Sequence, residues 1–406
     1  MDLTIRPITH EELPRYHRAM EGAFGMQARD EELEHMRRTT VLDRALGAFD
    51  GTSLIGTAEV WPFRLTTPGA EIALAGVTGV GVLPTHRRRG VLTALMRRQL
   101  DDVRGLGEPM AGLFASEGSI YGRFGYGVAA YAGRLEVDRD RARFASEVED
   151  PGRVVLVERD EALKTMPEVY ERLRGHRVGF VDRSERVWLD NYFDPEWGFR
   201  QGGGALFFAL HEAHGVDGYV SYRIKRDWSE GVPGATVLVE ELMAENLSAY
   251  AALWRFCFGI DLTSRTTAWG RPVDEPLLLM VTEPRRLKFR VGDGLYLRML
   301  DVPASLAGRR YATEGRLVFE VSDPFCPWVE GRYELTGGPD GADCAPTDAE
   351  ADVRLSVVEL SAAYLGGVGF RALHRAGRVD EDSPGALARA DAMFATDPAP
   401  WCPFVF

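Results

Sequence analysis

The chain has 406 residues, of which 45% are hydrophobic and 27% charged, a balance that excludes disordered and fibrous proteins. One compact core does not accommodate this length, so two or three domains are expected. The formal net charge of -13 argues against a general nucleic-acid binder, because neutralising phosphates requires an excess of Lys and Arg. The same charge favours encounter with cationic small molecules.

The start of the chain and its cysteines indicate the compartment. The stretch MDLTIRPITHEELPRYHRAM places acidic and polar side chains where a secretory signal needs a continuous apolar run, and no apolar run of membrane-spanning length follows. The cysteines are scattered without a C-x-x-C pair, which favours neither a disulfide framework nor a zinc site. They are Cys257, Cys326, Cys344 and Cys402. We expect a cytoplasmic protein with no metal and no membrane partner.

The first segment, residues 1–137, mixes short strands with two helices. Strands are predicted over 45–49, 54–61, 71–82 and 110–115, and helices over 10–24 and 90–104. The second helix has apolar side chains at helical spacing, namely Val91, Leu92, Leu95, Met96 and Leu100. This pattern predicts a mixed α/β domain.

A charged stretch at 138–153 marks a boundary, after which residues 138–288 roughly repeat the strand and helix order of the first segment. The predicted elements are strands near 153–157, 205–211, 217–224 and 235–241, and helices near 160–174 and 246–258. We find no second run of arginines followed by glycine in this segment. If the fold is duplicated, the copy has lost that motif.

The third segment, residues 289–406, has predicted strands and helices around a turn-rich stretch at 337–348. The strands are predicted at 316–321 and 351–357, and the helices at 358–364 and 387–394. The last ten residues hold three prolines and are predicted to be extended. Their apolar side chains favour a docked tail, because exposing a large one forfeits about 1.5–3 kcal/mol.

The most informative stretch is VTGVGVLPTHRRRGVLTALMRRQL, residues 77–100, a strand that turns through an arginine run and Gly90 into a helix. The N–H groups at a helix start are unpaired and carry the positive end of the helix dipole, so they bind anions. Gly90 permits close approach to the backbone, and the guanidinium groups of Arg87, Arg88 and Arg89 can pair with phosphate oxygens. The stretch predicts a pyrophosphate site, and a solvated basic cap is the alternative.

This arrangement resembles the GNAT superfamily of N-acetyltransferases, in which a strand precedes Arg/Gln-x-x-Gly-x-Gly/Ala and a helix. Leu92 departs from the small last residue of that pattern. A second signature, ASEGSIYGRFGYG at 115–127, places Tyr121 four residues before Gly125 and Tyr126. In the superfamily a tyrosine so placed lies beside the thioester sulfur. Core packing is the alternative for Tyr121 and the favoured role for Tyr126.

Taken together, HRRRG, ASEGSIYGRFGYG and the three-part length resemble the Eis (enhanced intracellular survival) acetyltransferases. The resemblance implies tandem GNAT-type acetyltransferase domains at 1–137 and 138–288, the second degenerate, and a sterol-carrier-protein-like domain at 289–406. It further implies acetyl-CoA as donor, a homohexamer, and acetylation of amines in aminoglycosides or other polyamine and lysine acceptors.

The resemblance also assigns donor contacts. These are Val80, Gly81, Val82, Arg87, Arg88, Arg89, Gly90, Val91, Leu92, Thr93, Ser116 and Glu117. Val80 and Val82 suit a strand end that pairs with pantetheine as an added strand, and ordinary sheet pairing is the alternative. An N–H there could also polarise the thioester carbonyl.

Amine acetylation needs a base for the amine and an acid for the departing thiolate. The phenol of Tyr121, with a reference pKa of about 10, suits the acid. The histidines are scattered and supply no obvious base. In the Eis family the C-terminal carboxylate reaches the active site, which implies that Phe406 supplies the base. Burial beside Trp401 and Phe404 would raise the low pKa of such a carboxylate.

The candidates for the acceptor pocket are Phe24 and Met36 near the first helix, with Trp61 and Trp197 further away, and core packing is the alternative for each. From the apolar side chains we select Phe24 and Trp401 as the predicted acceptor contacts. A carrier or lipid-binding protein with a vestigial acetyltransferase fold is the competing function. The intact arginine turn and Tyr121 argue against it, because a vestigial site need keep neither. An acyltransferase with a longer donor or an alcohol acceptor is a third possibility.

Overall fold

The computed structural model describes residues 2–27, 30–193, 202–228 and 231–406, and it confirms the mixed α/β class. The chain folds into two compact units. Unit 1 comprises Met1–Ala130, Asp293–Pro400 and Val405–Phe406, and unit 2 comprises Tyr131–Gly292 and Trp401–Phe404. Each unit therefore contains a part of the tail.

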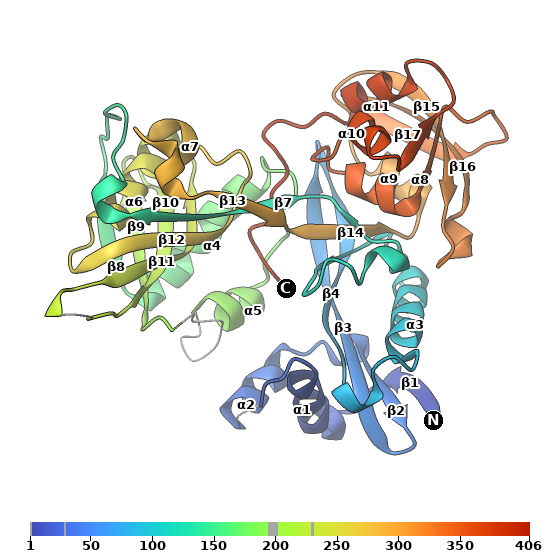
Figure 1. The fold of residues 1–406 in the computed structure, drawn as a ribbon, viewed down its shortest axis with the longest axis horizontal. Helices are drawn as coiled ribbons and strands as arrows, with labels where there is room; N and C mark the ends of the chain where they lie inside the picture. Colours follow the sequence, from blue (N-terminus) through green and yellow to red (C-terminus); the bar gives the residue numbers. More distant parts are fainter. Residues whose placement is uncertain (1, 28–29, 194–201, 229–230) are drawn as a thin grey trace. The chain divides into compact units, whose positions relative to one another are not determined.

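Unit 1 contains a seven-stranded sheet with the order β1-β2-β3-β4-β5-β14-β6 (Figure 1). The strands are β1 Leu3–Pro7, β2 Ala45–Asp50, β3 Ser53–Thr67, β4 Ala70–Val82, β5 Met110–Phe114, β6 Gly127–Val128 and β14 Leu295–Met299. Each pair of neighbours among β1, β2, β3 and β4 is antiparallel, whereas β4 and β5 are parallel. The predicted strand at 54–61 is longer than expected, because β3 continues to Thr67 as the partner of β4.

The helices of this sheet are α1 (Leu13–Ala23), α2 (Asp30–Thr39) and α3 (Val91–Gly105). Neighbouring residues of a strand point to opposite faces of its sheet. One core cluster joins α1 to Leu54, and another joins α3 to Ile55, so these two helices cover opposite faces of the sheet. The predicted apolar face of α3 is confirmed in its buried residues, but Leu92 is only partly buried.

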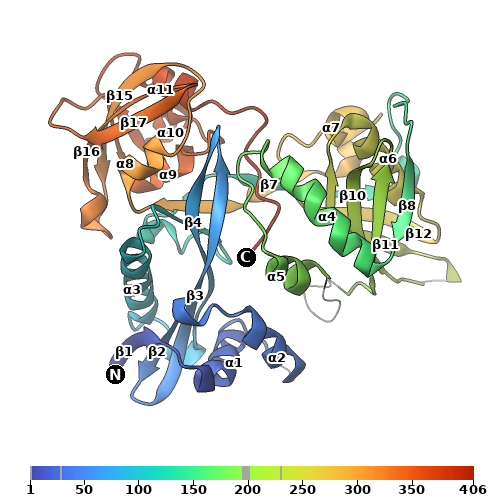
Figure 2. The same cartoon turned by 180° about the vertical axis from the view of Figure 1, so that it is seen from behind.

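Unit 2 contains a second seven-stranded sheet, with the order β13-β7-β12-β11-β10-β9-β8. The strands are β7 Tyr131–Asp138, β8 Arg153–Val157, β9 Leu206–Glu212, β10 Val216–Lys225, β11 Ala235–Ala244, β12 Thr263–Arg271 and β13 Arg290–Asp293. The helices are α4 Arg159–Arg174, α5 Glu185–Val187, α6 Leu247–Gly259 and α7 Leu277–Met280. Helix α4 packs with Phe208 and α6 with Ala209, so α4 and α6 cover opposite faces (Figure 2).

The two sheets have the same pattern. Read from β8, the second sheet runs through antiparallel neighbours to β11, continues with β12 parallel to β11, and then with β7 antiparallel to β12. Read from β1, the first sheet has the same sequence of directions and reaches β14 antiparallel to β5. The chain supplies β7 before the other strands of its sheet and β14 after all the strands of unit 2. The proposed boundaries at 137/138 and 288/289 stay a prediction.

The remainder of unit 1 contains a five-stranded sheet with the order β17-β16-β15-β18-β19. The strands are β15 Gly315–Ser322, β16 Gly331–Gly338, β17 Gly341–Pro346, β18 Val353–Ser356 and β19 Val379–Glu381, and the helices are α8 Val302–Ala307, α9 Val357–Ala363, α10 Phe370–Arg375 and α11 Ala386–Phe394. The prediction of a turn-rich loop at 337–348 is wrong, because β16 and β17 form a hairpin there around Pro339 and Asp340.

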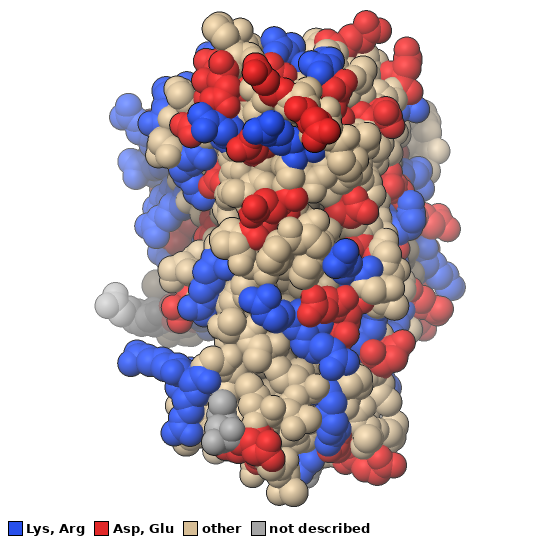
Figure 3. All heavy atoms as spheres, turned by 90° about the vertical axis from the view of Figure 1, so that its right-hand side faces the viewer, with Lys and Arg blue, Asp and Glu red and all other residues tan. Residues whose placement is uncertain are grey.

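Ion pairs cross the exposed side of this sheet. Arg332 faces Glu320 at 2.6 Å, and Arg316 binds Glu334 at 2.7 Å. Such cross-strand pairs contribute roughly 0.2–1 kcal/mol each. Acidic and basic side chains are also interspersed on the face shown in Figure 3. That face therefore presents a mixed field rather than one of a single sign.

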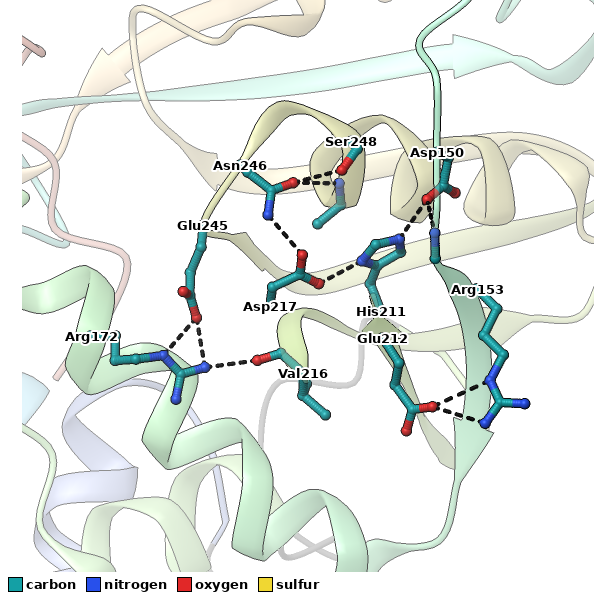
Figure 4. A network of polar contacts seen from close by, with 12 residues as sticks. Asp150, Arg153, Arg172, His211, Glu212, Val216, Asp217, Glu245, Asn246 and Ser248 are labelled. Carbon is teal, nitrogen blue, oxygen red and sulfur yellow. Dashed lines mark hydrogen bonds and ion pairs between the residues drawn. The ribbon is translucent and has the colours of Figure 1, made fainter. Parts of the chain in front are cut away.

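A buried histidine organises one end of unit 2 (Figure 4). The Nδ1 atom of His211 lies 2.5 Å from a carboxylate oxygen of Asp217, and its Nε2 atom lies 2.9 Å from one of Asp150. Asp217 also accepts a hydrogen bond from Asn246, whose side chain caps α6 by accepting from Ala249 N. Because both ring nitrogens face carboxylates, the geometry favours the protonated imidazolium, with both nitrogens donating.

Gly127 provides a packing prediction. A Cβ atom at this residue would overlap the carbonyl oxygen of Val358 and lie 2.9 Å from the backbone nitrogen of Ala362, both in α9. We expect Gly127→Ala to lower the free energy of unfolding of unit 1 by about 1–3 kcal/mol, because the α9 backbone must move. Denaturant unfolding measures this loss. Gly105→Ala, with open space around its Cβ, is the control, and an equal loss there would contradict the argument.

His211 provides a pH prediction. Burial alone would lower its pKa, but the hydrogen bonds that the ring donates to Asp217 and Asp150 outweigh burial and raise the pKa. A histidine whose pKa is higher in the folded than in the unfolded protein stabilises the fold. This stabilisation is complete below the unfolded-state pKa of about 6.5, and it is lost as the pH rises through the folded-state pKa. The melting temperature of the wild-type protein should therefore fall as the pH rises through that window, and it should fall less in His211→Asn. The exposed His214→Asn is the control, and an unchanged slope in His211→Asn would contradict the argument.

Candidate active site

The site begins where two parallel strands separate. The ladder between β4 and β5 joins Leu74 to Met110, Ala75 to Ala111 and Gly76 to Gly112, and it ends there. Strand β4 nevertheless continues to Val82. Its edge on the β5 side can therefore receive an extended ligand as an added strand. Val80, Gly81 and Val82, which we predicted to contact the donor, lie in this part of β4.

A bulge fixes the direction of that strand end. Thr57 pairs with Gly81 and Glu59 with Thr78, so β4 has one residue more than β3 between these pairs. Gly79 has a φ of 59°, and its carbonyl accepts a hydrogen bond from Thr57 Oγ1 at 2.8 Å. A Cβ atom at Gly79 would lie 2.9 Å from the sulfur of Met20 in α1. The glycine therefore lets α1 pack directly against the bulge.

The arginine turn lies between β4 and α3. Arg87, Arg88, Arg89 and Gly90 are all exposed, and Gly90 is the N-cap of α3 with a φ of 81°. Glycine has no side chain to cap the helix, and Ala94 N is bonded to Gly90 O at 3.0 Å. The N–H groups of Val91, Leu92 and Thr93 therefore precede the first intrahelical bond and suit an anion.

The three arginines of the turn are not equivalent. Arg87 donates to the carbonyl of Ala23 at 2.7 Å and to that of Val82 at 3.3 Å. It thus ties the turn to the end of α1 and the end of β4. Arg88 has a φ of 61°, a left-handed conformation that costs a non-glycine residue about 1 kcal/mol and is often found at functional sites. The exposed Arg88 and Arg89 suit phosphate contacts better than Arg87.

Tyr121 lies in the turn that follows β5. Ser116 and Glu117 are exposed in the first part of this turn, whereas Tyr121 is buried. Its carbonyl accepts from Phe124 N at 2.9 Å and from Tyr126 N at 3.3 Å. Among the described residues, none hydrogen-bonds the Tyr121 hydroxyl. Burial raises its pKa from the usual 10, so the phenol remains protonated at neutral pH and can donate a proton.

The last residue packs where the two strands separate. The Phe406 ring lies 4.9 Å from that of Phe63 in β3 and 5.3 Å from that of Phe114 at the end of β5. Gly76 is the last residue of β4 that pairs with β5, and a Cβ atom there would lie 3.1 Å from the Phe406 ring. The predicted docked end of the tail is thus found at this opening. No motif in the sequence identifies Phe63, Phe114 or Gly76 as its partners.

The two acceptor-pocket candidates lie in different surroundings. Phe24 is exposed at the end of α1. Trp401 is buried in the core of unit 2, where its indole Nε1 donates to Gly270 O at 2.6 Å and its ring lies 5.3 Å from that of Phe180. These contacts tie Trp401 to unit 2, whereas Phe406 belongs to unit 1.

The equivalent place in the second sheet is unsuited to phosphate. The parallel ladder of β11 and β12 ends at Val239 and Ala268, and β11 continues to Ala244. Only Glu245 and Asn246 separate β11 from α6, and the Asn246 side chain already caps that helix (Figure 4). The carboxylates of Glu245 and Asp217 lie beside it and are already paired with Arg172 and His211.

No group of three or more His, Cys, Asp or Glu among the described residues is arranged to hold a metal ion. None of the described helices has the length and apolar character needed to cross a membrane.

Comparison with known proteins agrees with this geometry. Residues 4–129 and 179–299 each match a model of an acetyltransferase (GNAT) domain, and residues 302–403 match a sterol carrier protein domain. The predicted order of tandem GNAT domains and a sterol-carrier-like domain is thus confirmed. GNAT acetyltransferases use acetyl-CoA as co-substrate, which suits a strand opening followed by an anion-binding helix start.

Relatives match along the whole chain. An uncharacterized N-acetyltransferase of Streptomyces avermitilis is 43% identical over 410 residues, which cover 100% of both chains. N-acetyltransferase Eis of Mycobacterium tuberculosis is 38% identical over 361 residues, covering 86% of this chain and 85% of the relative. The crystal structure of Eis1 from Mycobacterium abscessus superposes with a TM-score of 0.84 at 33% identity, covering 99% of this chain and 100% of Eis1. The chain therefore belongs to the Eis-like family of GNAT N-acetyltransferases and is an N-acetyltransferase enzyme.

Proposed function

We propose that this enzyme transfers the acetyl group of acetyl-CoA to amines of aminoglycosides or of other polyamine or lysine acceptors. Tyr121 acts as the general acid and the main-chain carboxylate of Phe406 as the general base. The packing of Phe406 at the β4–β5 opening carries the proposal, since it brings the end of the chain to the place that suits the donor.

The donor lies along the opening. Its pantetheine arm pairs with Val80 to Val82, and its pyrophosphate occupies the turn from Arg87 to Thr93. Ser116 and Glu117 contact the donor from the exposed turn after β5. Support comes from the end of the ladder at Gly76 and from the unpaired N–H groups at the start of α3. Arg87 contributes by holding the turn in place.

The chemical step balances with these two groups. The Phe406 carboxylate accepts a proton from the acceptor ammonium, and the neutral amine attacks the acetyl carbon. The carbon–sulfur bond breaks, and the sulfur of the departing CoA takes the phenolic proton of Tyr121. The nitrogen loses its remaining extra proton to solvent as the amide forms. Solvent then reprotonates the tyrosine, and the Phe406 carboxylate releases its proton to solvent. A phenol with the ordinary pKa of about 10 is protonated when the thiolate leaves, and burial, which raises the pKa of Tyr121, keeps it so.

The acceptor is a cationic amine, and the enzyme is a cytoplasmic homohexamer without nucleic-acid or membrane partners. The net charge of -13 supports a cationic acceptor and disfavours nucleic acid. The similarity to N-acetyltransferase Eis of Mycobacterium tuberculosis supports an amine acceptor. The homohexamer is what the family resemblance implies. Phe24 and Trp401 remain the candidates for acceptor contacts.

Thiol release with acetyl-CoA measures the reaction directly. We expect turnover with aminoglycosides, polyamines or lysine peptides, and little with alcohols of similar size. Propionyl-CoA and longer acyl-CoAs in the same assay test the donor. If no amine led to thiol release, the proposal would be contradicted. Faster turnover with longer acyl-CoAs than with acetyl-CoA would contradict acetyl-CoA as the donor.

The two catalytic groups can be tested separately. We expect Tyr121→Phe and an added C-terminal glycine each to lower kcat by about 100-fold or more, because each removes a proton-transfer group. Acetyl-CoA affinity, measured by calorimetry, should change little. Tyr126→Phe is the matched control, because this buried hydroxyl of the same turn has no hydrogen-bond partner among the described residues. If these variants bound acetyl-CoA more weakly and kept the wild-type kcat, the two groups would be structural rather than catalytic.

A further inference from the structure

A short turn of the sterol-carrier-like part contacts the first sheet. The turn comprises Asp323 to Cys326 and follows β15. The Oδ1 atom of Asp323 accepts hydrogen bonds from Phe325 N at 3.1 Å and Cys326 N at 2.9 Å, and its Oδ2 atom accepts from Arg298 Nη2 at 2.5 Å. Asp323 and Arg298 are both fully buried. Arg298 lies on β14, so the ion pair joins the turn to the first sheet.

Arg298 also supports the turn that carries Tyr121. Its guanidinium lies against Gly125, where a Cβ atom would be 2.5 Å from Nε and 2.6 Å from Cζ. Gly125 has a φ of 89° and ends the helical turn that begins after Tyr121. Only a residue without a side chain lets the guanidinium lie on this backbone. The Nε atom of Arg298 has no hydrogen-bond partner among the described residues, a cost that packing for stability alone does not explain.

Phe325 connects the same turn to both sides of the donor site. Its ring lies 5.1 Å from that of Phe124, in the Tyr121 turn. On its other side, the guanidinium carbon of Arg97 lies 4.5 Å from the Phe325 ring centre, and Arg97 Nη1 donates to Phe325 O at 3.1 Å. Arg97 lies on α3, whose first turn faces the pyrophosphate in the proposed function. The turn at 323–326 thus contacts both the helix and the Tyr121 turn.

We propose that Arg298 and Asp323 are positioning residues that hold the Tyr121 hydroxyl in place for proton transfer. This inference rests on the proposed role of Tyr121. A buried ion pair stabilises a fold little more than apolar residues of similar volume, but it fixes orientation strongly. A displacement of about 1 Å at a reacting group costs about 100-fold in rate. The sterol-carrier-like part therefore contributes to catalysis through this turn.

A double-mutant cycle tests the proposal. We expect Arg298→Met to lower kcat by about tenfold or more in the wild-type background, with little change in the acetyl-CoA KM. In the Tyr121→Phe background the same substitution should cost almost nothing further, because the hydroxyl that it positions is absent. Arg298→Lys, which keeps the charge, should recover part of kcat. Arg332→Met, which breaks an exposed ion pair of the same part of the chain, is the control and should leave kcat unchanged.

The outcomes separate the two proposals. Equal losses from Arg298→Met in both backgrounds would show a general structural role and overturn the positioning inference alone. A Tyr121→Phe enzyme with wild-type kcat would overturn the proposed acid, and the positioning role with it. If Arg298→Met does not fold, Asp323→Asn provides the same cycle, since it removes the charge while keeping the shape and the backbone hydrogen bonds of the turn.

Discussion

The separation of β4 from β5 after three residue pairs is the constraint on which the rest of the site depends. Two parallel strands that remained paired would satisfy each other's backbone groups and leave no edge for a ligand. The extra residue in β4, the left-handed Gly79 and the close contact with α1 direct β4 away from β5. The arginine turn then begins at the diverging end, and the Phe406 ring packs at the closed end. Donor and base are thus proposed at the two ends of one opening.

The second sheet shows that this opening alone does not make a donor site. Its parallel strands β11 and β12 separate in the same way. In that sheet the side chain of Arg271, at the end of β12, donates to Leu242 O of β11 at 2.9 Å, and Trp401 bonds to Gly270 O. These side chains, together with the Asn246 cap, bind backbone groups that an added ligand would otherwise pair with.

Local elements were predictable where local pattern determines them. The predictions for β4, β5, α3, α4 and α6 agree with the structure to within about one residue, because their apolar periodicity is strong. The donor role of the arginine turn and the acid role of Tyr121 also come from a local signal, the spacing of glycine, arginine and tyrosine, and both roles stay predictions. The partners of Phe406 were not, because Phe63, Gly76 and Phe114 lie far away in sequence. Strand β14 is absent from the predicted elements for a related reason, since a run of five residues, LYLRM, does not indicate which sheet it completes.

The positions of β7 and β14 along the chain have a consequence for the order in which the two sheets can form during translation. Translation delivers the N-terminal sheet first, yet its strand β14 leaves the ribosome only after all of β7 to β13. Until then β5 and β6 lack the strand that lies between them, and unpaired strand edges invite association with other chains. Neither acetyltransferase half is therefore a self-sufficient module. Fusions, truncations or split versions cut near residues 138 or 289 would each separate a sheet from one of its own strands.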